Sequence, residues 1–121
     1  PHQSSAASDV YKRQVFDVLN SLWQKEGVYF LISSDLSHFH SYDEAQKIDL
    51  QTATLVDKCE WQALSGERAC GYKGIQGLLQ MVKSENLTIK RMSVLNSGDT
   101  AGDKQRVVGY GSWAVYDREA C

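Results

Sequence analysis

The chain has 121 residues, of which 42% are hydrophobic, and its 13 lysines and arginines against 15 aspartates and glutamates give a net charge of −2. This balance excludes the strongly basic surface that nucleic acids and anionic membranes require, and no run approaches the roughly 18 apolar residues of a membrane span. Three cysteines, Cys59, Cys70 and Cys121, do not make a disulfide framework, so we expect a cytoplasmic protein without a nucleic-acid or membrane partner.

The first fourteen residues are expected to lie outside the folded domain. The eleven residues Ser4–Gln14 lack apolar periodicity, and they resemble the in-frame translation of a transposon mosaic-end sequencing adapter. A native but disordered polar tail is the alternative, since a serine- and alanine-rich stretch suits it. We therefore set residues 1–14 aside as a disordered, adapter-like tail and take residues 15–121 as the folded part.

A helix and a buried strand are predicted next. Apolar residues recur at helical spacing from Val15 to Trp23, and Gly27 suits the end of this helix. Val28–Ile32 is a short run of apolar, strand-favouring residues, which predicts a strand buried on both faces in a parallel sheet. Ser33–Ser41 would then be the loop at the carboxyl end of this strand.

Two helices are predicted in the middle of the chain. Ser41, followed three residues later by Glu44, predicts the start of the first helix through a capping box. Trp61–Gly71 is a polar and irregular connector, and Lys73–Ser84 has the apolar spacing of a second helix.

Two strands are predicted in the last third. Leu87–Leu95 alternates in the manner of a strand, Asn96–Lys104 is a loop rich in glycine and aspartate, and Arg106–Tyr116 is a long strand. The order of elements predicts an α/β fold, with a mixed, mostly parallel sheet flanked by helices.

Chemically active side chains gather directly after the predicted buried strand. Ser33–His40 places a carboxylate, two imidazoles and three hydroxyls where open α/β sheets bind ligands. Asp35 and His38 face one another if the loop turns, so that the carboxylate fixes the histidine tautomer for acid–base catalysis or metal binding. The alternative is that Asp35 and the neighbouring serines only cap turns.

Cys70 is a second candidate, at the N-terminal end of the predicted helix Lys73–Ser84. Backbone amides at such an end favour a thiolate, which binds metals or, paired with a histidine, acts as the nucleophile of a hydrolase. The alternative is a small buried hydrophobe, the interpretation that we also give to Cys59 and Cys121.

The loop Asn96–Lys104 is a third candidate. Its glycines permit the close approach of a ligand and its aspartates could bind a cation, but its spacing matches neither an EF-hand nor a Walker loop. We expect a turn that lines a site built by other residues. The residues predicted to line the cleft are Ser34, Ser37, Gly71, Asn96, Ser97 and Asp99.

Taken in order, these segments resemble the C-terminal part of the MEMO family, whose bacterial members are called AmmeMemoRadiSam system protein B. The matching stretches are Ile32–Phe39, Ala69–Gly71, Leu95–Asp99 and Val107–Gly111, and it is their joint occurrence over about a hundred residues that makes the resemblance specific. The fold of the family is similar to that of class III extradiol dioxygenases. The resemblance therefore implies that residues 15–121 are a C-terminal fragment of such a fold.

The resemblance also implies roles for individual residues. Cys70 matches a metal-ligating cysteine, His38 matches a histidine that faces the metal as acid and base, and Asp35 is its close neighbour. Two further metal-ligating histidines belong to the N-terminal half of the family, which this chain lacks. We therefore expect iron or copper in the intact protein and no metal in the fragment.

The implied setting is a redox or modification pathway with radical-SAM and AMMECR-type proteins as partners. Two alternatives stay open at this point. One is a non-enzymatic module that binds a peptide or protein in the same cleft, and the other is an extradiol dioxygenase-like enzyme.

Overall fold

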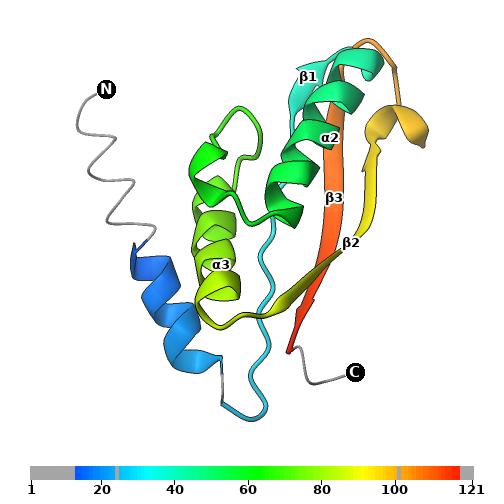
Figure 1. Ribbon diagram of the computed structural model, residues 1–121. Coiled ribbons are helices and arrows are strands. Elements are labelled where there is room, and N and C mark those ends of the chain that lie inside the picture. Colours follow the sequence, from blue (N-terminus) through cyan, green and yellow to red (C-terminus); the bar gives the residue numbers. More distant parts are fainter. Residues whose placement is uncertain (1–12, 24, 101, 118–121) are drawn as a thin grey trace.

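The computed structural model describes residues 13–23, 25–100 and 102–117 (Figure 1). Residues 13–22 form the predicted N-terminal helix, whose first turn includes two residues of the expected tail, whereas residues 1–12 and Cys121 lie outside the described residues. The elements that follow are β1 (His38–His40), α2 (Tyr42–Asp57), the short 3-10 helix η1 (Trp61–Ala63), α3 (Tyr72–Ser84), β2 (Thr88–Asn96), the short 3-10 helix η2 (Ser97–Asp99) and β3 (Val107–Tyr116). The predicted α/β class is confirmed.

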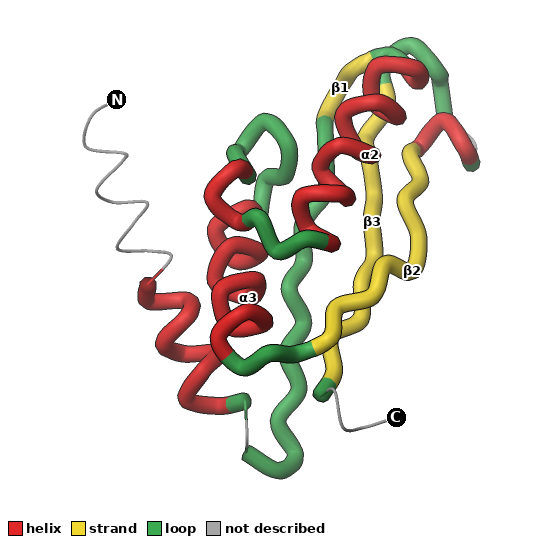
Figure 2. Tube along the Cα trace, viewed as in Figure 1, coloured by secondary structure: helices red, strands yellow, loops and turns green. Residues whose placement is uncertain are grey.

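The described strands form one sheet in the order β1–β3–β2, and both neighbouring pairs are antiparallel. The long hairpin of β2 and β3 runs from Thr88 opposite Tyr116 to Asn96 opposite Gly109. Its two strands agree with the predicted ones to within one residue at each end. Figure 2 shows α2 lying over the sheet, roughly along β3, and the N-terminal helix beside α3.

The two long helices begin where local sequence predicts. The hydroxyl of Ser41 accepts a hydrogen bond from the backbone N–H of Glu44, which confirms the predicted N-cap of α2. The hydrophobic core lies where α2 and α3 meet the β2–β3 hairpin. Its buried members are Val56, Cys59, Leu64, Leu79 and Val82.

The segment Val28–Ile32 is the main departure from the predicted fold. It belongs to no described strand, and the side chains of Tyr29 and Leu31 are 93% and 92% exposed. The predicted strand, buried on both faces in a parallel sheet, is therefore wrong for the described residues. A parallel ladder needs neighbouring strands in the same direction, whereas every pairing between described strands is antiparallel.

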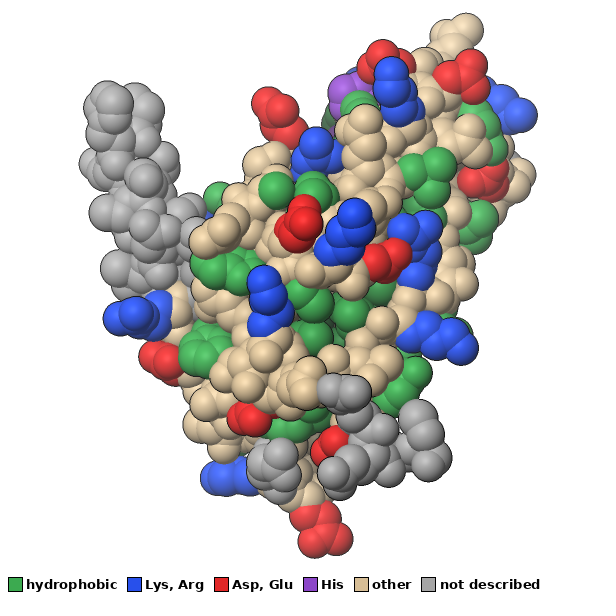
Figure 3. Space-filling view, in the orientation of Figure 1, with side chains coloured by type: hydrophobic (Ala, Val, Ile, Leu, Met, Phe, Trp, Pro, Cys, Tyr) green, Lys and Arg blue, Asp and Glu red, His purple; other side chains and the backbone are tan. Residues whose placement is uncertain are grey.

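The surface agrees with the balanced charge of the sequence. On the face shown in Figure 3, acidic and basic side chains are interspersed and do not form a patch of one sign. No helix within the described ranges is both long and apolar enough to cross a membrane.

Candidate functional site

The segment that precedes β1 is held against β3 by backbone hydrogen bonds. The N–H of Leu36 donates to the carbonyl of Gly109 at 2.8 Å, and the N–H of Gly109 donates to the carbonyl of Ser37 at 2.9 Å. His38 then begins β1, opposite Val108. The sequence pattern assigns β1 to a loop, because three residues are too few for a strand period to show.

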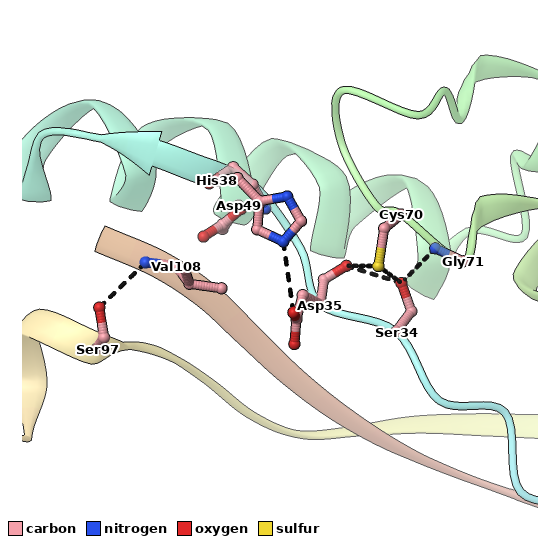
Figure 4. A network of polar contacts seen from close by, with 9 residues as sticks. Ser34, Asp35, His38, Asp49, Cys70, Gly71, Ser97 and Val108 are labelled. Carbon is pink, nitrogen blue, oxygen red and sulfur yellow. Dashed lines mark hydrogen bonds and ion pairs between the residues drawn. The ribbon is translucent and has the colours of Figure 1, made fainter. Parts of the chain in front are cut away.

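Asp35, His38 and Cys70 converge at this end of the sheet. Nε2 of His38 lies 3.4 Å from Oδ2 of Asp35, so the two side chains face one another as predicted. The potential ligand atoms of all three residues lie within 4.8 Å of one another, and Figure 4 shows Asp35 between His38 and Cys70. Among the described residues, no other group of three or more histidines, cysteines and carboxylates is this close.

The three side chains are accessible from solvent. The side chains of His38 and Asp35 are 35% and 48% exposed, and Cys70 is also exposed. A metal ion or a small substrate can therefore reach the cluster without a rearrangement of the chain. We call Asp35, His38 and Cys70 the metal-ligand cluster.

Ser34 and Gly71 join the two segments that carry the metal-ligand cluster. The hydroxyl of Ser34 accepts a hydrogen bond from the N–H of Gly71 at 2.9 Å and donates one to the carbonyl of Asp35 at 2.7 Å. The same hydroxyl lies 3.8 Å from Sγ of Cys70. A Cβ on Gly71 would lie only 2.8 Å from Cβ of Ser34, so this close approach requires glycine.

The described cysteines differ in environment. Cys70 is exposed and directly precedes Gly71, the N-cap residue of α3, so the interpretation of Cys70 as a buried hydrophobe is wrong. Cys59 is buried in the core, as predicted, and burial raises the pKa of its thiol.

Asn96, Ser97 and Asp99 are used by their own turn. The side chain of Asn96 accepts from the N–H of Gly98 at 2.8 Å, and that of Asp99 accepts from the N–H of Asn96 at 2.9 Å, which forms a capping box. The hydroxyl of Ser97 accepts from the N–H of Val108 at 3.0 Å. None of the three belongs to the metal-ligand cluster, and their predicted cleft-lining role stays a prediction.

Asp49 of α2 is a candidate that sequence reasoning misses. Its side chain is 1% exposed, and Oδ1 accepts a hydrogen bond from the N–H of Ser37 at 3.0 Å. Ser37 is fully buried, and its predicted cleft-lining role stays a prediction. The sequence signal that could have identified Asp49 is its spacing. It lies four positions from both Ala45 and Ala53, on the inward face of a helix.

An apolar cavity of about 570 Å³ opens beside the cluster. It is lined by the extended segment Val28–Ile32, by Ser34 and Leu36, and by the part of β3 that follows Tyr110. Side chains of α2 and α3 also line it, among them Val56, Ile75, Leu78 and Leu79.

Comparison with known proteins decides the family. A family model described as "Memo-like protein" matches residues 4–114. The chain belongs to the Memo-like family. The matched range also includes residues 4–14, so the adapter-like origin of this Memo-like chain's tail stays a prediction.

Curated relatives give the same assignment. A MEMO1 family protein of Sulfolobus acidocaldarius is 32% identical over 92 residues, which cover 71% of this chain and 32% of the relative. A MEMO1 family protein of Thermoplasma acidophilum is 32% identical over 90 residues, covering 69% of this chain and 33% of the relative. The chain thus spans about a third of the length of the curated relatives that it matches.

Proposed function

We propose that this Memo-like chain contributes Cys70 to a centre for a redox-active metal, iron or copper, and that His38 and Asp35 serve as its acid–base pair. The observation that carries the proposal is the convergence of one thiol, one imidazole and one carboxylate within 4.8 Å. Thiolate and imidazole are ligands that suit copper and iron in proteins, so the donor set fits such a metal.

Cys70 by itself leaves the coordination shell of such a metal incomplete. The family resemblance suggests that two more imidazoles come from polypeptide outside these 121 residues. The chain's coverage of only about a third of its relatives is in keeping with this suggestion. When bound, the metal would supply Lewis acidity and electron transfer.

His38 would move protons at this site. With the proton on Nε2 donated to Asp35, Nδ1 is left as the atom that accepts a proton from a bound substrate. Asp35 would hold this tautomer and stabilise the imidazolium that forms. Cooperation with radical-SAM and AMMECR-type proteins is part of the proposal and rests on the family resemblance.

Metal analysis of the longer polypeptide encoded by the source gene tests the ligand assignment. We expect iron or copper in the purified protein and loss of most of it in Cys70→Ser. The matched control is Cys59→Ser, because Cys59 is a buried core thiol outside the metal-ligand cluster. Unchanged metal content in Cys70→Ser would exclude Cys70 as a ligand.

A separate comparison tests the acid–base role. His38→Ala should retain the metal but lose turnover, whereas His40→Ala should retain both. Loss of metal in His38→Ala would instead make His38 a ligand. An extradiol dioxygenase-like enzyme would consume oxygen in the presence of a catechol, and this reaction is assayed with the same proteins.

A second candidate function is a module that binds an apolar peptide without catalysis. The apolar cavity beside Ser34 favours it, since its lining of apolar side chains suits the apolar side chains of an extended peptide. Fluorescence anisotropy with a labelled peptide of alternating valines tests this function. Binding that is unchanged in both His38→Ala and Cys70→Ser would favour the module over the metal centre.

A further inference from the structure

We propose that Asp49 is a positioning residue that holds Asp35 and His38 opposite Cys70, and that Gly109 makes room for its carboxylate. The proposal rests on the proposed function, because it assigns the support of that same metal-ligand cluster. Asp49 contacts none of the reacting groups itself. It acts through the backbone of Ser37, the residue that directly precedes His38.

Ser37 is fixed from two sides. Oδ1 of Asp49 accepts the hydrogen bond from its N–H at 3.0 Å, and its carbonyl accepts from the N–H of Gly109 at 2.9 Å. The first contact ties the segment to α2 and the second ties it to β3. Figure 4 shows Asp49 next to His38, at the start of β1. The separation of the Asp35 and His38 side chains therefore depends on how Ser37 is held.

Burial of the Asp49 carboxylate costs free energy, so we ask which interaction it makes that an apolar side chain could not. It is 1% exposed, and its second oxygen, Oδ2, has no hydrogen-bond partner among the described residues. A buried carboxylate with an unsatisfied oxygen costs free energy, and a well-packed apolar residue often gives an equal or more stable fold. Packing alone does not account for Asp49, whereas an acceptor for the buried N–H of Ser37 does.

Gly109 is the structural complement of Asp49. A Cβ at this position would overlap Oδ2 of Asp49 and would lie 2.6 Å from its Cγ. The carboxylate thus occupies the space directly over the backbone of β3 at the residue that bonds to Leu36 and Ser37. Any side chain at Gly109 would push the carboxylate away from Ser37.

Substitutions at Asp49 separate its two attributes, the acceptor and the charge. Asp49→Ala leaves the buried N–H of Ser37 without a partner, so we expect the segment from Asp35 to His38 to shift away from Cys70. Asp49→Asn has the same shape and keeps an acceptor oxygen for Ser37, so we expect it to keep the cluster in place.

Titration of the 121-residue chain with Co²⁺ measures the effect, because a thiolate ligand gives a cobalt charge-transfer band. His38 and Asp35 serve as the acid–base pair in the proposed metal centre, but in the 121-residue chain alone they are the donors nearest to Cys70. A Co²⁺ probe added in excess is therefore expected to bind all three weakly and to show the band. We expect Asp49→Ala to weaken Co²⁺ binding at least about tenfold, as is usual for residues that support metal ligands, and Asp49→Asn to restore it to within about twofold. Asp57→Ala is the control, because it breaks contacts of α2 with Arg91 and Trp113 instead.

Each outcome bears on one of the two proposals. If Cys70→Ser abolishes the band but Asp49→Ala leaves the affinity unchanged, the role of Asp49 is wrong and the metal centre stands. The role is also wrong if Asp57→Ala weakens binding as much as Asp49→Ala at an equal loss of stability. If Asp49→Ala does not fold, Gly109→Ala takes its place, and we expect it to weaken Co²⁺ binding by the same factor. An unchanged Co²⁺ affinity in Gly109→Ala would overturn the positioning role of Asp49.

Hydrogen exchange decides the role of Asp49 if the wild-type chain gives no band that depends on Cys70, and metal analysis of the longer polypeptide then decides the proposed function separately. We then expect the N–H groups of Ser37 and Gly109 to exchange at least about tenfold faster in Asp49→Ala than in Asp49→Asn. Equal exchange rates in the two variants would overturn the positioning role.

Discussion

The hydroxyl of Tyr42, in the first turn of α2, donates a hydrogen bond to the carboxylate of Asp99, in the turn between β2 and β3. The backbone of Tyr42 makes a second tie, since its N–H donates to the carbonyl of Lys104 at 2.9 Å. Nζ of Lys104 also lies 4.9 Å from the centre of the Tyr42 ring. These contacts fix the glycine-rich loop against the helix that carries Asp49.

The bond between Tyr42 and Asp99 predicts a pH-dependent stability. It lowers the pKa of Asp99 and raises the pKa of Tyr42. The stability that Asp99 contributes to the fold is present above its unfolded pKa of about 3.9, and it is lost as the pH falls through the lower pKa of the folded state. The stability that Tyr42 contributes is present below its unfolded pKa of about 10, and it is lost as the pH rises through the higher pKa of the folded state.

Tyr42→Phe should therefore lower the free energy of unfolding near neutral pH and flatten its decline at both extremes. Urea unfolding between acid and alkaline pH measures this, with Tyr110→Phe as a control that removes another partly exposed hydroxyl. A Tyr42→Phe curve parallel to that of the wild type over the whole range would contradict the assignment.

Gly71→Ala should be destabilising through a steric clash with Ser34. The new Cβ would lie 2.8 Å from Cβ of Ser34 and 2.9 Å from the carbonyl of Ser33, and crowding of this kind typically costs about 1–3 kcal/mol. The control is Gly66→Ala, where the nearest atom, on Tyr72, lies at an ordinary 3.6 Å. Urea unfolding measures both variants, and equal free energies would show that the contact between Gly71 and Ser34 is not formed in solution.

Local sequence signals predict much of this molecule. The cap formed by Ser41 and Glu44, the hairpin of β2 and β3, and the facing of Asp35 and His38 all depend on residues near in sequence or on a regular period. Such signals survive in a single sequence because backbone geometry alone converts spacing into proximity.

The features that sequence reasoning misses depend on contacts between distant segments. β1 is a strand only because β3 supplies a partner for its three residues. Asp49 matters only once Ser37 and Gly109 are brought to it by the fold. Val28–Ile32 has the composition of a buried strand, but composition does not supply the neighbouring strands that would bury it.

The exposed side chain of Leu31 should promote self-association. Leu31→Lys is expected to reduce light scattering at high protein concentration, because exposed apolar extended segments are sites of aggregation. It should change the free energy of unfolding by less than about 0.5 kcal/mol, since the side chain is 92% exposed. Ile32→Lys is the matched control, because it places the same charge at a half-buried position that lines the cavity and should cost more than about 1 kcal/mol. An equal loss of unfolding free energy in the two variants would show that the side chain of Leu31 is covered in solution.

The exposed Cys70 and the buried Cys59 should differ in reactivity toward an electrophile. In a Cys121→Ser background, which leaves only these two thiols, iodoacetamide should modify Cys70 at least about tenfold faster at neutral pH, because reaction requires an accessible thiolate. Burial raises the pKa of Cys59, so its thiolate is both scarcer and less accessible. Mass spectrometry of the digested protein measures the two rates. Urea should bring them close together, because unfolding removes the burial that protects Cys59, and equal rates in native buffer would contradict the burial of that thiol in the core.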